Sequence, residues 1–146
     1  MVHALRDIHR LLKPEGILID IHPLDEAALF EVHQEGEILH TEADPNFSGE
    51  DYRQADIALS HVVQQGWFFL ERTRQFDFRV YASSVTELRD FLTEANAYED
   101  KVVDQVAQDE TEQVARRLEQ VMQAAGIGVE VAMLERGRIS RLRTIR

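Results

Sequence analysis

The sequence predicts an α/β fold, α+β for the isolated piece, in which helices flank a small mixed sheet. Three observations predict it. The first 23 residues read as a helix, a turn and a strand. Residues 75–81 alternate apolar and polar side chains, which is typical of a strand with one buried face. Two later stretches, 84–92 and 98–125, repeat apolar residues at helical spacing. A length of 146 residues predicts a single domain spanning residues 1–146.

The opening segment contains the strongest pattern in the chain. Its helical part has one apolar side, formed by Val2, Leu5, Ile8, Leu11 and Leu12. Lys13–Gly16 ends the helix, because a proline just past a helix cannot continue it and glycine accepts a tight turn. Ile17–Ile21 follows as a mainly apolar run without alternation. That run predicts a strand covered on both faces.

The middle of the chain contains weaker signals. Residues 24–33 are weakly helical, and residues 36–41 read as a short strand. The Asp-Pro and Ser-Gly pairs within residues 44–50 predict a loop. A helix is expected from about Gly49 to Gln65, because Ala55, Ala58, Leu59 and Val62 share one face; Gly66 then stops it.

The last third predicts two helices and a final extended segment. Ser84 or Ser83 caps the first helix, and Glu87, three residues after Ser84, completes a capping box. The second helix is expected from Tyr98 or Asp100 to Ala125, with a bend or break where its apolar stripe is interrupted at residues 109–112. Residues 129–145 then form either one long strand or a hairpin that turns at residues 136–137.

Residues 4–21, with the sequence ALRDIHRLLKPEGILIDI, resemble a segment of class I S-adenosylmethionine-dependent methyltransferases. In that family a helix ending in a Leu-Lys-Pro-Gly-Gly-like turn leads into the fifth strand. The match lies at Ala4, Leu5, Arg10–Pro14, Gly16 and Ile17–Ile21, whereas Glu15 replaces the first glycine of the usual pair. The strands expected near residues 76–81 and 129–143 are compatible with the family's C-terminal part. The short motif also fits a helix–strand junction of any other α/β protein.

The resemblance covers only the C-terminal half of such an enzyme. The family binds its cofactor on a glycine-rich loop that follows the first strand, where glycine lets backbone amides approach the ligand. Of the seven glycines here, only Gly126 and Gly128 are close together, and they follow a helix. The resemblance therefore implies a Rossmann-like C-terminal part without cofactor-binding residues. S-adenosylmethionine would be a cofactor only if a missing half were supplied.

The amino-acid composition limits which compartment and which partners are expected. The chain contains no cysteine, which excludes disulfides and thiolate metal sites and fits a cytoplasmic protein. Its uncharged apolar runs are far shorter than the roughly 20 residues that a membrane helix needs. The formal net charge of −11 disfavours nucleic acid and anionic membranes. We therefore expect a soluble protein, no membrane partner and no nucleic acid.

The last eleven residues depart from this acidic balance. They contain five arginines and no acid, namely Arg136, Arg138, Arg141, Arg143 and Arg146. Such a segment can bind an anion, but no aromatic residue is interleaved to stack bases. The competing interpretation is a strand that pairs with the protein's own acidic surface, or an edge strand protected by charge.

Asp20 and His22 are the candidate catalytic residues, although the sequence assigns neither a role. They end the first expected strand, and ligands of open α/β sheets bind beyond the carboxyl ends of strands. Two residues apart on a strand, they project from the same face. A carboxylate and an imidazole there suit acid–base work or substrate contact. The competing interpretation is that His22 and Pro23 merely end the strand.

Six histidines raise the question of a metal site, which we do not expect. No HxxxH pair or HExxH motif occurs. His33, Glu35, Glu37 and His40 are the set that a turn brings nearest to one another. Scattered surface histidines explain them more simply. The carboxylates Asp109, Glu110 and Glu112 do not have the spacing of a calcium-binding loop.

Two classes of function compete. The first is an enzyme part, a methyltransferase-related domain that does not bind S-adenosylmethionine or transfer methyl groups by itself. The second is a catalytically inactive binding or structural module, and an unrelated α/β small-ligand-binding domain is a third possibility. A half-sheet exposes an apolar edge that must be covered. We therefore expect a homodimer, or docking onto a chain that carries the missing half.

Overall fold

The computed structural model describes residues 1–95 and 105–145, and these contain a five-stranded sheet with four helices. The chain divides into two compact units. Unit 1 comprises Met1–Glu26, Ser48–Asp77 and Arg136–Arg146, and unit 2 comprises Ala27–Phe47 and Phe78–Glu135. The strands β4 (Phe68–Ala82) and β5 (Val129–Thr144) run through both units. The single domain 1–146 stays a prediction.

The predicted α+β class, a small sheet flanked by helices, is confirmed. The three strand pairs with a defined register, β1 with β5, β2 with β3 and β2 with β5, are all antiparallel. The sheet is therefore antiparallel, whereas mixed pairing was expected. Antiparallel sheets often leave one face open, and unit 1 does so.

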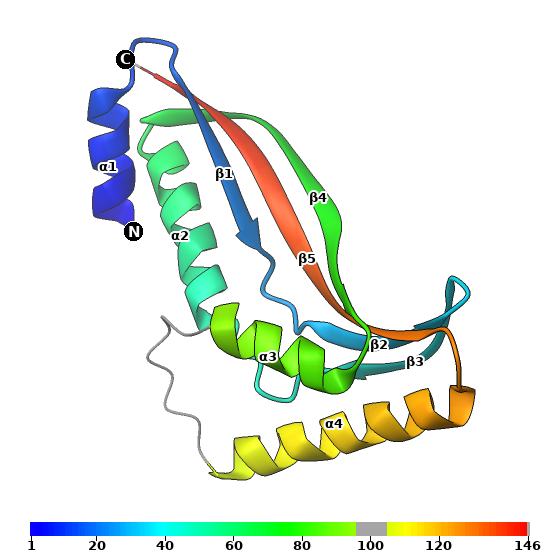
Figure 1. The fold of residues 1–146 in the computed structure, drawn as a ribbon. Helices are drawn as coiled ribbons and strands as arrows, with labels where there is room; N and C mark the ends of the chain where they lie inside the picture. Colours follow the sequence, from blue (N-terminus) through cyan, green and yellow to red (C-terminus); the bar gives the residue numbers. More distant parts are fainter. Residues whose placement is uncertain (96–104, 146) are drawn as a thin grey trace. The chain divides into compact units, whose positions relative to one another are not determined.

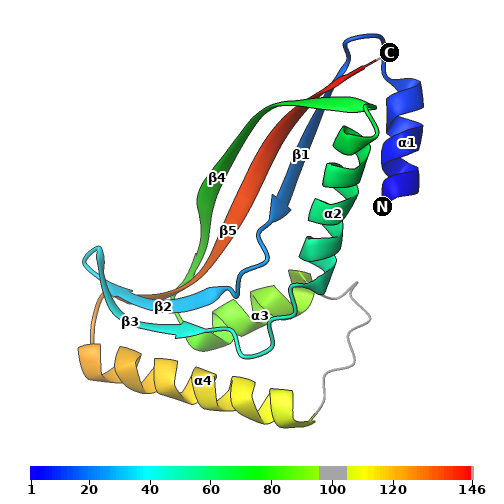
Figure 2. The same cartoon turned by 180° about the vertical axis from the view of Figure 1, so that it is seen from behind.

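Unit 1 contains α1 (Val2–Leu11), β1 (Ile17–Pro23), α2 (Glu50–Gln64) and the adjoining parts of β4 and β5. β5 pairs with both β1 and β4, so it is the middle strand of this unit. Both helices lie on the same side of the three strands (Figures 1 and 2). Leu5 of α1 and Leu59 and Val62 of α2 form the core there, together with Phe68 and Leu142 of the strands.

The strand β1 alternates between a half-buried and an exposed face, so the prediction of a strand covered on both faces is wrong. Leu18 faces the helices and packs on the core of unit 1. Ile17, Ile19 and Ile21 are 43%, 50% and 62% exposed. Their partners across the pair are Arg143, Arg141 and Ile139 of β5. We call the surface formed by these three isoleucines the isoleucine row.

The turn before β1 uses a residue other than glycine in the left-handed region. Glu15 has φ of 59°, whereas Gly16 does not have a positive φ. Gly16 is required for a different reason, because a Cβ there would lie 2.8 Å from the carbonyl oxygen of Lys13. Glu15 therefore adopts a conformation that favours glycine.

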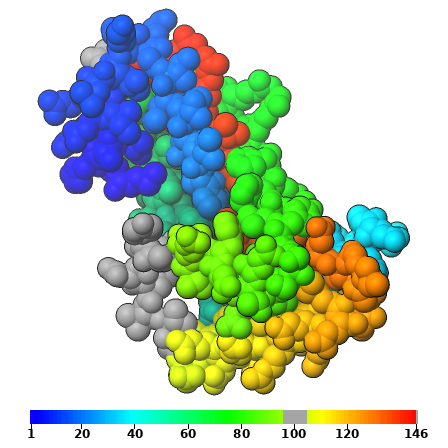
Figure 3. Space-filling model, in the orientation of Figure 1, coloured from blue at the N-terminus to red at the C-terminus, as the bar shows by residue number. Residues whose placement is uncertain are grey.

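Unit 2 contains β2 (Leu29–Gln34), β3 (Glu37–Ala43), α3 (Val85–Ala95) and α4 (Gln105–Ala125), with the remaining parts of β4 and β5. Its core joins Val32 and Val131 of the sheet to Leu88 of α3 and Leu118 of α4. α3 and α4 lie side by side in the space-filling view (Figure 3). Half of the expected capping box is present, since Ser84 Oγ accepts a hydrogen bond from the Glu87 amide at 3.1 Å. The Glu87 carboxylate accepts from the Ser83 amide at 2.8 Å instead of the Ser84 amide.

Residues 24–33 were predicted to be weakly helical, and this is wrong, because no helix lies within them. Leu29–Gln34 is the strand β2, which forms a hairpin with β3 through Glu35 and Gly36. Both turn residues have positive φ, 53° and 85°, as the tightest hairpin turns require. The sequence did not predict this strand, because polar side chains are expected on an exposed face, whereas Glu31 and His33 are buried.

The two C-terminal predictions have different outcomes. Residues 129–144 form one continuous strand, so the hairpin at residues 136–137 is excluded. The expected start of the last helix at Tyr98 or Asp100 lies outside the described residues. From Gln105 to Ala125 the helix is continuous, and the anticipated break at residues 109–112 is absent from this described stretch.

Candidate functional site

Four side chains of unit 1 form a charged network on the helix-facing side of its sheet. Nδ1 of His22 lies 2.7 Å from Oδ2 of Asp20, and Nε2 of His22 lies 2.9 Å from Oδ1 of Asp56. The Nη2 atom of Arg138 forms an ion pair with Asp56 and lies 3.2 Å from Nε2 of His22. Each side chain comes from a fixed position on a helix or strand, so the network is preorganised.

The strand register explains how these residues meet. Asp20 lies opposite Ser140, and His22 lies opposite Arg138, on neighbouring antiparallel strands. Alternation along β1 and β5 places these side chains on the face that packs against α2. Asp56 extends from α2 toward the same place. The side chains of Asp20 and His22 are only 11% and 10% exposed.

The imidazole of His22 has both ring nitrogens engaged by protein groups. Nδ1 donates to Asp20, while Nε2 either donates to Asp56 or accepts from Arg138, according to its protonation. A general base needs a free nitrogen within reach of a substrate proton. In this geometry His22 therefore acts as a structural link between β1, α2 and β5.

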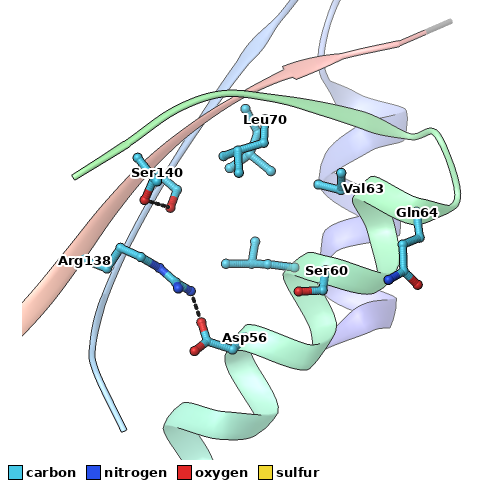
Figure 4. A pocket seen from close by; sticks show the side chains of 10 residues that line it. Asp56, Ser60, Val63, Gln64, Leu70, Arg138 and Ser140 are labelled. Carbon is cyan, nitrogen blue, oxygen red and sulfur yellow. Dashed lines mark hydrogen bonds and ion pairs between the residues drawn. The ribbon is translucent and has the colours of Figure 1, made fainter. Parts of the chain in front are cut away.

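A pocket of about 310 Å³ adjoins this network (Figure 4). Its walls come from α2, β4 and β5 of unit 1, and they combine aliphatic, hydroxyl and charged side chains. The lining residues are Asp56, Leu59, Ser60, Val63, Gln64, Leu70, Thr73, Arg138, Ser140 and Leu142. Its size and mainly apolar lining with a few polar groups are typical of small-molecule sites.

The polar groups of the pocket differ in how well they are satisfied. Thr73 Oγ1 lies 3.2 Å from Ser140 Oγ, so these two hydroxyls bond to each other. Nε of Arg138 is buried and has no hydrogen-bond partner among the described residues. A buried donor without an acceptor is uncommon in folded proteins and calls for an explanation.

The structure brings the two candidate residues together, but not as a free acid–base pair. Asp20 and His22 share a face, as expected, and bind each other. Neither lines the pocket. Asp56 and Arg138 connect them to it, and the sequence reasoning missed both. Pairing the Arg-rich tail with the first strand would have placed Arg138 opposite His22, but no sequence pattern marks Asp56.

Unit 2 has its own buried polar cluster. Glu31 is 3% exposed and accepts hydrogen bonds from Nε of Arg79 at 2.9 Å and from Nε2 of His33 at 2.7 Å. The ring of Tyr81 contacts His33 edge-on, with centroids 5.4 Å apart. Burial acts to raise the pKa of Glu31, but the bonds from Arg79 and His33 hold it below its ordinary value. The cluster is a neutralised structural network.

The histidines near the hairpin have separate partners. His33 binds Glu31, whereas His40 binds Glu42 at 2.8 Å. Glu42 also accepts a bidentate hydrogen bond from Arg117 of α4, which lowers its pKa. Within residues 1–95 and 105–145, no group of three or more His, Asp or Glu side chains gathers as metal ligands.

Four of the five C-terminal arginines pair with acids of their own unit, and Arg146 lies outside the described residues. Arg136 lies near Glu26 and Asp77, and Arg141 lies 2.7 Å from Glu71. Arg143 pairs with Glu71 and lies 3.6 Å from Glu15. This agrees with pairing to the protein's own acidic surface. β5 is a middle strand of unit 1, so protection of an edge strand does not explain these charges.

Comparisons with protein-family models, curated proteins and solved structures found no match to this chain. Among the helices that the structure describes, none has the length and apolar character needed to cross a membrane.

Proposed function

We propose that the chain is a methyltransferase-related domain, corresponding to the C-terminal, substrate-side half of a class I fold. The edge position of β1 carries the proposal. β1 follows the Leu-Lys-Pro-Glu-Gly turn, and β5 is its partner among the described strands. In the resembling family, the strand after this turn is flanked on its other side by strands of the cofactor-binding half. A half without those strands would have the open edge and exposed isoleucine row of β1.

The same proposal holds that the chain neither binds S-adenosylmethionine nor transfers methyl groups by itself. The glycine pair at residues 126 and 128 lies between α4 and β5, in the order helix, loop, strand. A cofactor loop of that family needs the reverse order, so that a helix begins at the ligand. The cofactor would enter with a separate chain or with a longer gene product that carries the missing half.

The partner is expected to cover β1. Exposed apolar side chains on an edge strand form a docking surface, because pairing satisfies the free backbone groups and buries the isoleucines. We assign this surface to a cytoplasmic chain carrying the missing half, and we expect neither nucleic acid nor membrane there.

A homodimeric, catalytically inactive module is the second candidate. The spacing of the isoleucine row favours it, because antiparallel pairing of two β1 strands centred on Ile19 places Ile17 of one copy opposite Ile21 of the other. Such an isologous contact would bury the same row in both copies and needs no second gene product.

Calorimetry with S-adenosylmethionine and light scattering in the same buffer test these assignments. We expect no heat of binding for the purified chain. A mass of 16.8 kDa would favour the separate partner, and twice that mass would favour the homodimer. Binding at low-micromolar concentration would overturn the proposal, because it would require a donor site in this chain.

A pair of variants locates the interface. Ile19→Asp places a charge in the isoleucine row, whereas Ile57→Asp places one at a similarly exposed position on α2. Any association through β1, with a second copy or with a chain carrying the missing half, is expected to be lost with Ile19→Asp alone. Equal loss with both variants would contradict an interface on β1.

A further inference from the structure

The part of β4 that belongs to unit 1 has a free outer edge. Among the described strands β4 pairs with β5 alone, and it lies at the opposite border of the three strands from β1 (Figures 1 and 2). The backbone N–H and C=O groups that point away from β5 therefore have no strand partner within residues 1–95 and 105–145. Such an edge can accept one further strand, because pairing satisfies these groups.

The pocket of unit 1 opens beside this edge. Its floor is formed by β5, where Ser140 and Leu142 are 4% and 1% exposed. None of the described residues of β1 lines it. Its exposed lining residues come from α2 and β4, namely Ser60, Gln64, Leu70 and Thr73. The mouth of the pocket therefore lies between α2 and β4, which Figure 4 shows on two sides of it.

Positive charge accompanies the free edge. Arg72 and Arg74 of β4 are exposed and have no ion-pair partner among the described residues. Glu71 and Asp77, the acids at the two ends of this stretch, are already paired with arginines of β5. An acidic group on an added strand would therefore be attracted to this part of β4.

The two faces of the sheet present different surfaces to an added strand. On the helix side lies the mainly aliphatic pocket of about 310 Å³. A dry cavity of about 150 Å³ holds benzene, so this pocket has room for a leucine side chain. Arg74 lies on the open side, because Phe76, two residues further along β4, has its ring over Gly137, and Gly137 faces away from α2, unlike Arg138.

We propose that this edge binds an extended peptide segment of a partner protein, which adds to β4 as a further strand and inserts one apolar side chain into the pocket. Side chains alternate along a strand, so the residues directly before and after the apolar one lie on the open side near Arg74, and they are acidic. Strand addition of this kind combines backbone hydrogen bonds with a pocket that selects a side chain. The proposal does not rest on the methyltransferase relation, which concerns the opposite edge strand, β1.

Synthetic peptides test the proposal on the intact chain. The probe is acetyl-Thr-Thr-Glu-Leu-Glu-Thr-Thr-amide, whose leucine is the anchor. Titration of ¹⁵N-labelled chain would follow the backbone amides, and we expect shifts at residues 70–75 and at Ser60. A peptide with alanine in place of leucine, and one with lysine in place of both glutamates, should each bind at least about tenfold more weakly.

Two N-methylated peptides test whether the probe binds as a strand. The N–H groups of successive residues in a strand point to opposite edges. Methylation of the leucine nitrogen and methylation of the following glutamate nitrogen therefore have different effects. One removes a hydrogen bond to β4 and places a methyl group against it, whereas the other alters only the solvent-facing edge. We expect the two affinities to differ by at least about tenfold.

Variants of the chain test the pocket and the charges separately. Ser60→Phe places a ring at the exposed rim of the pocket and should abolish binding. Combining Arg72→Glu with Arg74→Glu should reverse the charge preference, so that the lysine peptide binds more tightly than the glutamate peptide. Arg6→Glu changes an exposed arginine of α1 that does not line the pocket, and this matched control should keep the preference for glutamate.

Each contrary result overturns the proposal. An absence of shifts at residues 70–75, with the glutamate peptide up to its solubility limit, would mean that β4 is not the binding edge. Equal affinity for the leucine and alanine peptides would exclude the pocket as the anchor site. Equal affinity for the two N-methylated peptides would exclude strand addition, and an unchanged charge preference in the double variant would exclude recognition of acids by Arg72 and Arg74.

Discussion

Nε2 of His22 lies 2.9 Å from Oδ1 of Asp56, which connects the end of β1 to the side of α2. The same carboxylate pairs with Arg138, so it joins three elements of unit 1. Loss of this one group would leave two cationic or donor groups without their acceptor. Asp56 therefore has a larger structural role than its intermediate exposure suggests.

Replacing Asp56 with alanine is expected to lower the free energy of unfolding by about 1–2 kcal/mol. The loss arises because His22 and Arg138 keep part of their desolvation cost without the carboxylate. Urea denaturation at pH 7 measures it. Asp7→Ala removes the carboxylate of an exposed pair with Arg10 at 3.8 Å and should change stability by less than about 0.5 kcal/mol. Equal effects of the two variants would contradict the role assigned to Asp56.

Local patterns were enough to predict most elements of this fold. The first helix, its turn, the strand near residue 78 and the helix ending at Ala125 follow from periodicity and from stop signals. The strand β2 could not be predicted in this way, because two of its polar residues, Glu31 and His33, are buried. Glu31 can be buried because it binds Arg79, which lies 48 residues further along the chain. Periodicity assumes that polar residues face solvent.

The candidate site was predicted only in part, for a related reason. Asp20 and His22 were marked by their place at the end of a strand. Asp56 and Arg138 matter because α2 and β5 bring them to that strand, and such pairings depend on tertiary structure. The exposed face of β1 was missed because an apolar run gives no sign of whether both faces of its strand are covered.

Lowering the pH should remove the stability that the ion pair between Glu31 and Arg79 contributes. The folded pKa of Glu31 lies below the unfolded value, so the carboxylate contributes stability above the unfolded pKa. That contribution is lost as the pH falls below about 4.5, through the folded pKa. Glu31→Gln is expected to be less stable than the parent chain by about 3 kcal/mol at pH 7.

Urea denaturation between pH 7 and pH 2.5 checks this prediction. The stability difference between the parent chain and Glu31→Gln should be constant at neutral pH and shrink in the acid range. The reason is that a protonated Glu31, like glutamine, has no charge to pair with Arg79. A difference that stays the same across the whole range would contradict the lowered pKa of Glu31.

Glu15→Gly is expected to stabilise unit 1 by about 0.5–1 kcal/mol. Glu15 has φ of 59°, a conformation that glycine adopts without the Cβ penalty. Its distant pair with Arg143 is exposed and contributes little. The matched change Gly16→Ala should destabilise instead, because its Cβ would lie 2.8 Å from the Lys13 oxygen. Thermal unfolding of both variants measures the contrast, and a lower melting temperature for Glu15→Gly would contradict it.

Gly137 of β5 is the place where the ring of Phe76 lies directly over the backbone. A Cβ at position 137 would be 2.5 Å from Cζ of that ring, so Gly137→Ala must displace it. We expect a loss of about 1–2 kcal/mol in the parent chain and a smaller loss in a Phe76→Ala background. Gly128→Ala is the control, because its cost comes from a φ of 76° and should not depend on Phe76. Urea denaturation of the single and double variants measures how strongly each of the two glycine substitutions is coupled to Phe76→Ala. Equal couplings to Phe76 would contradict the contact between the two strands.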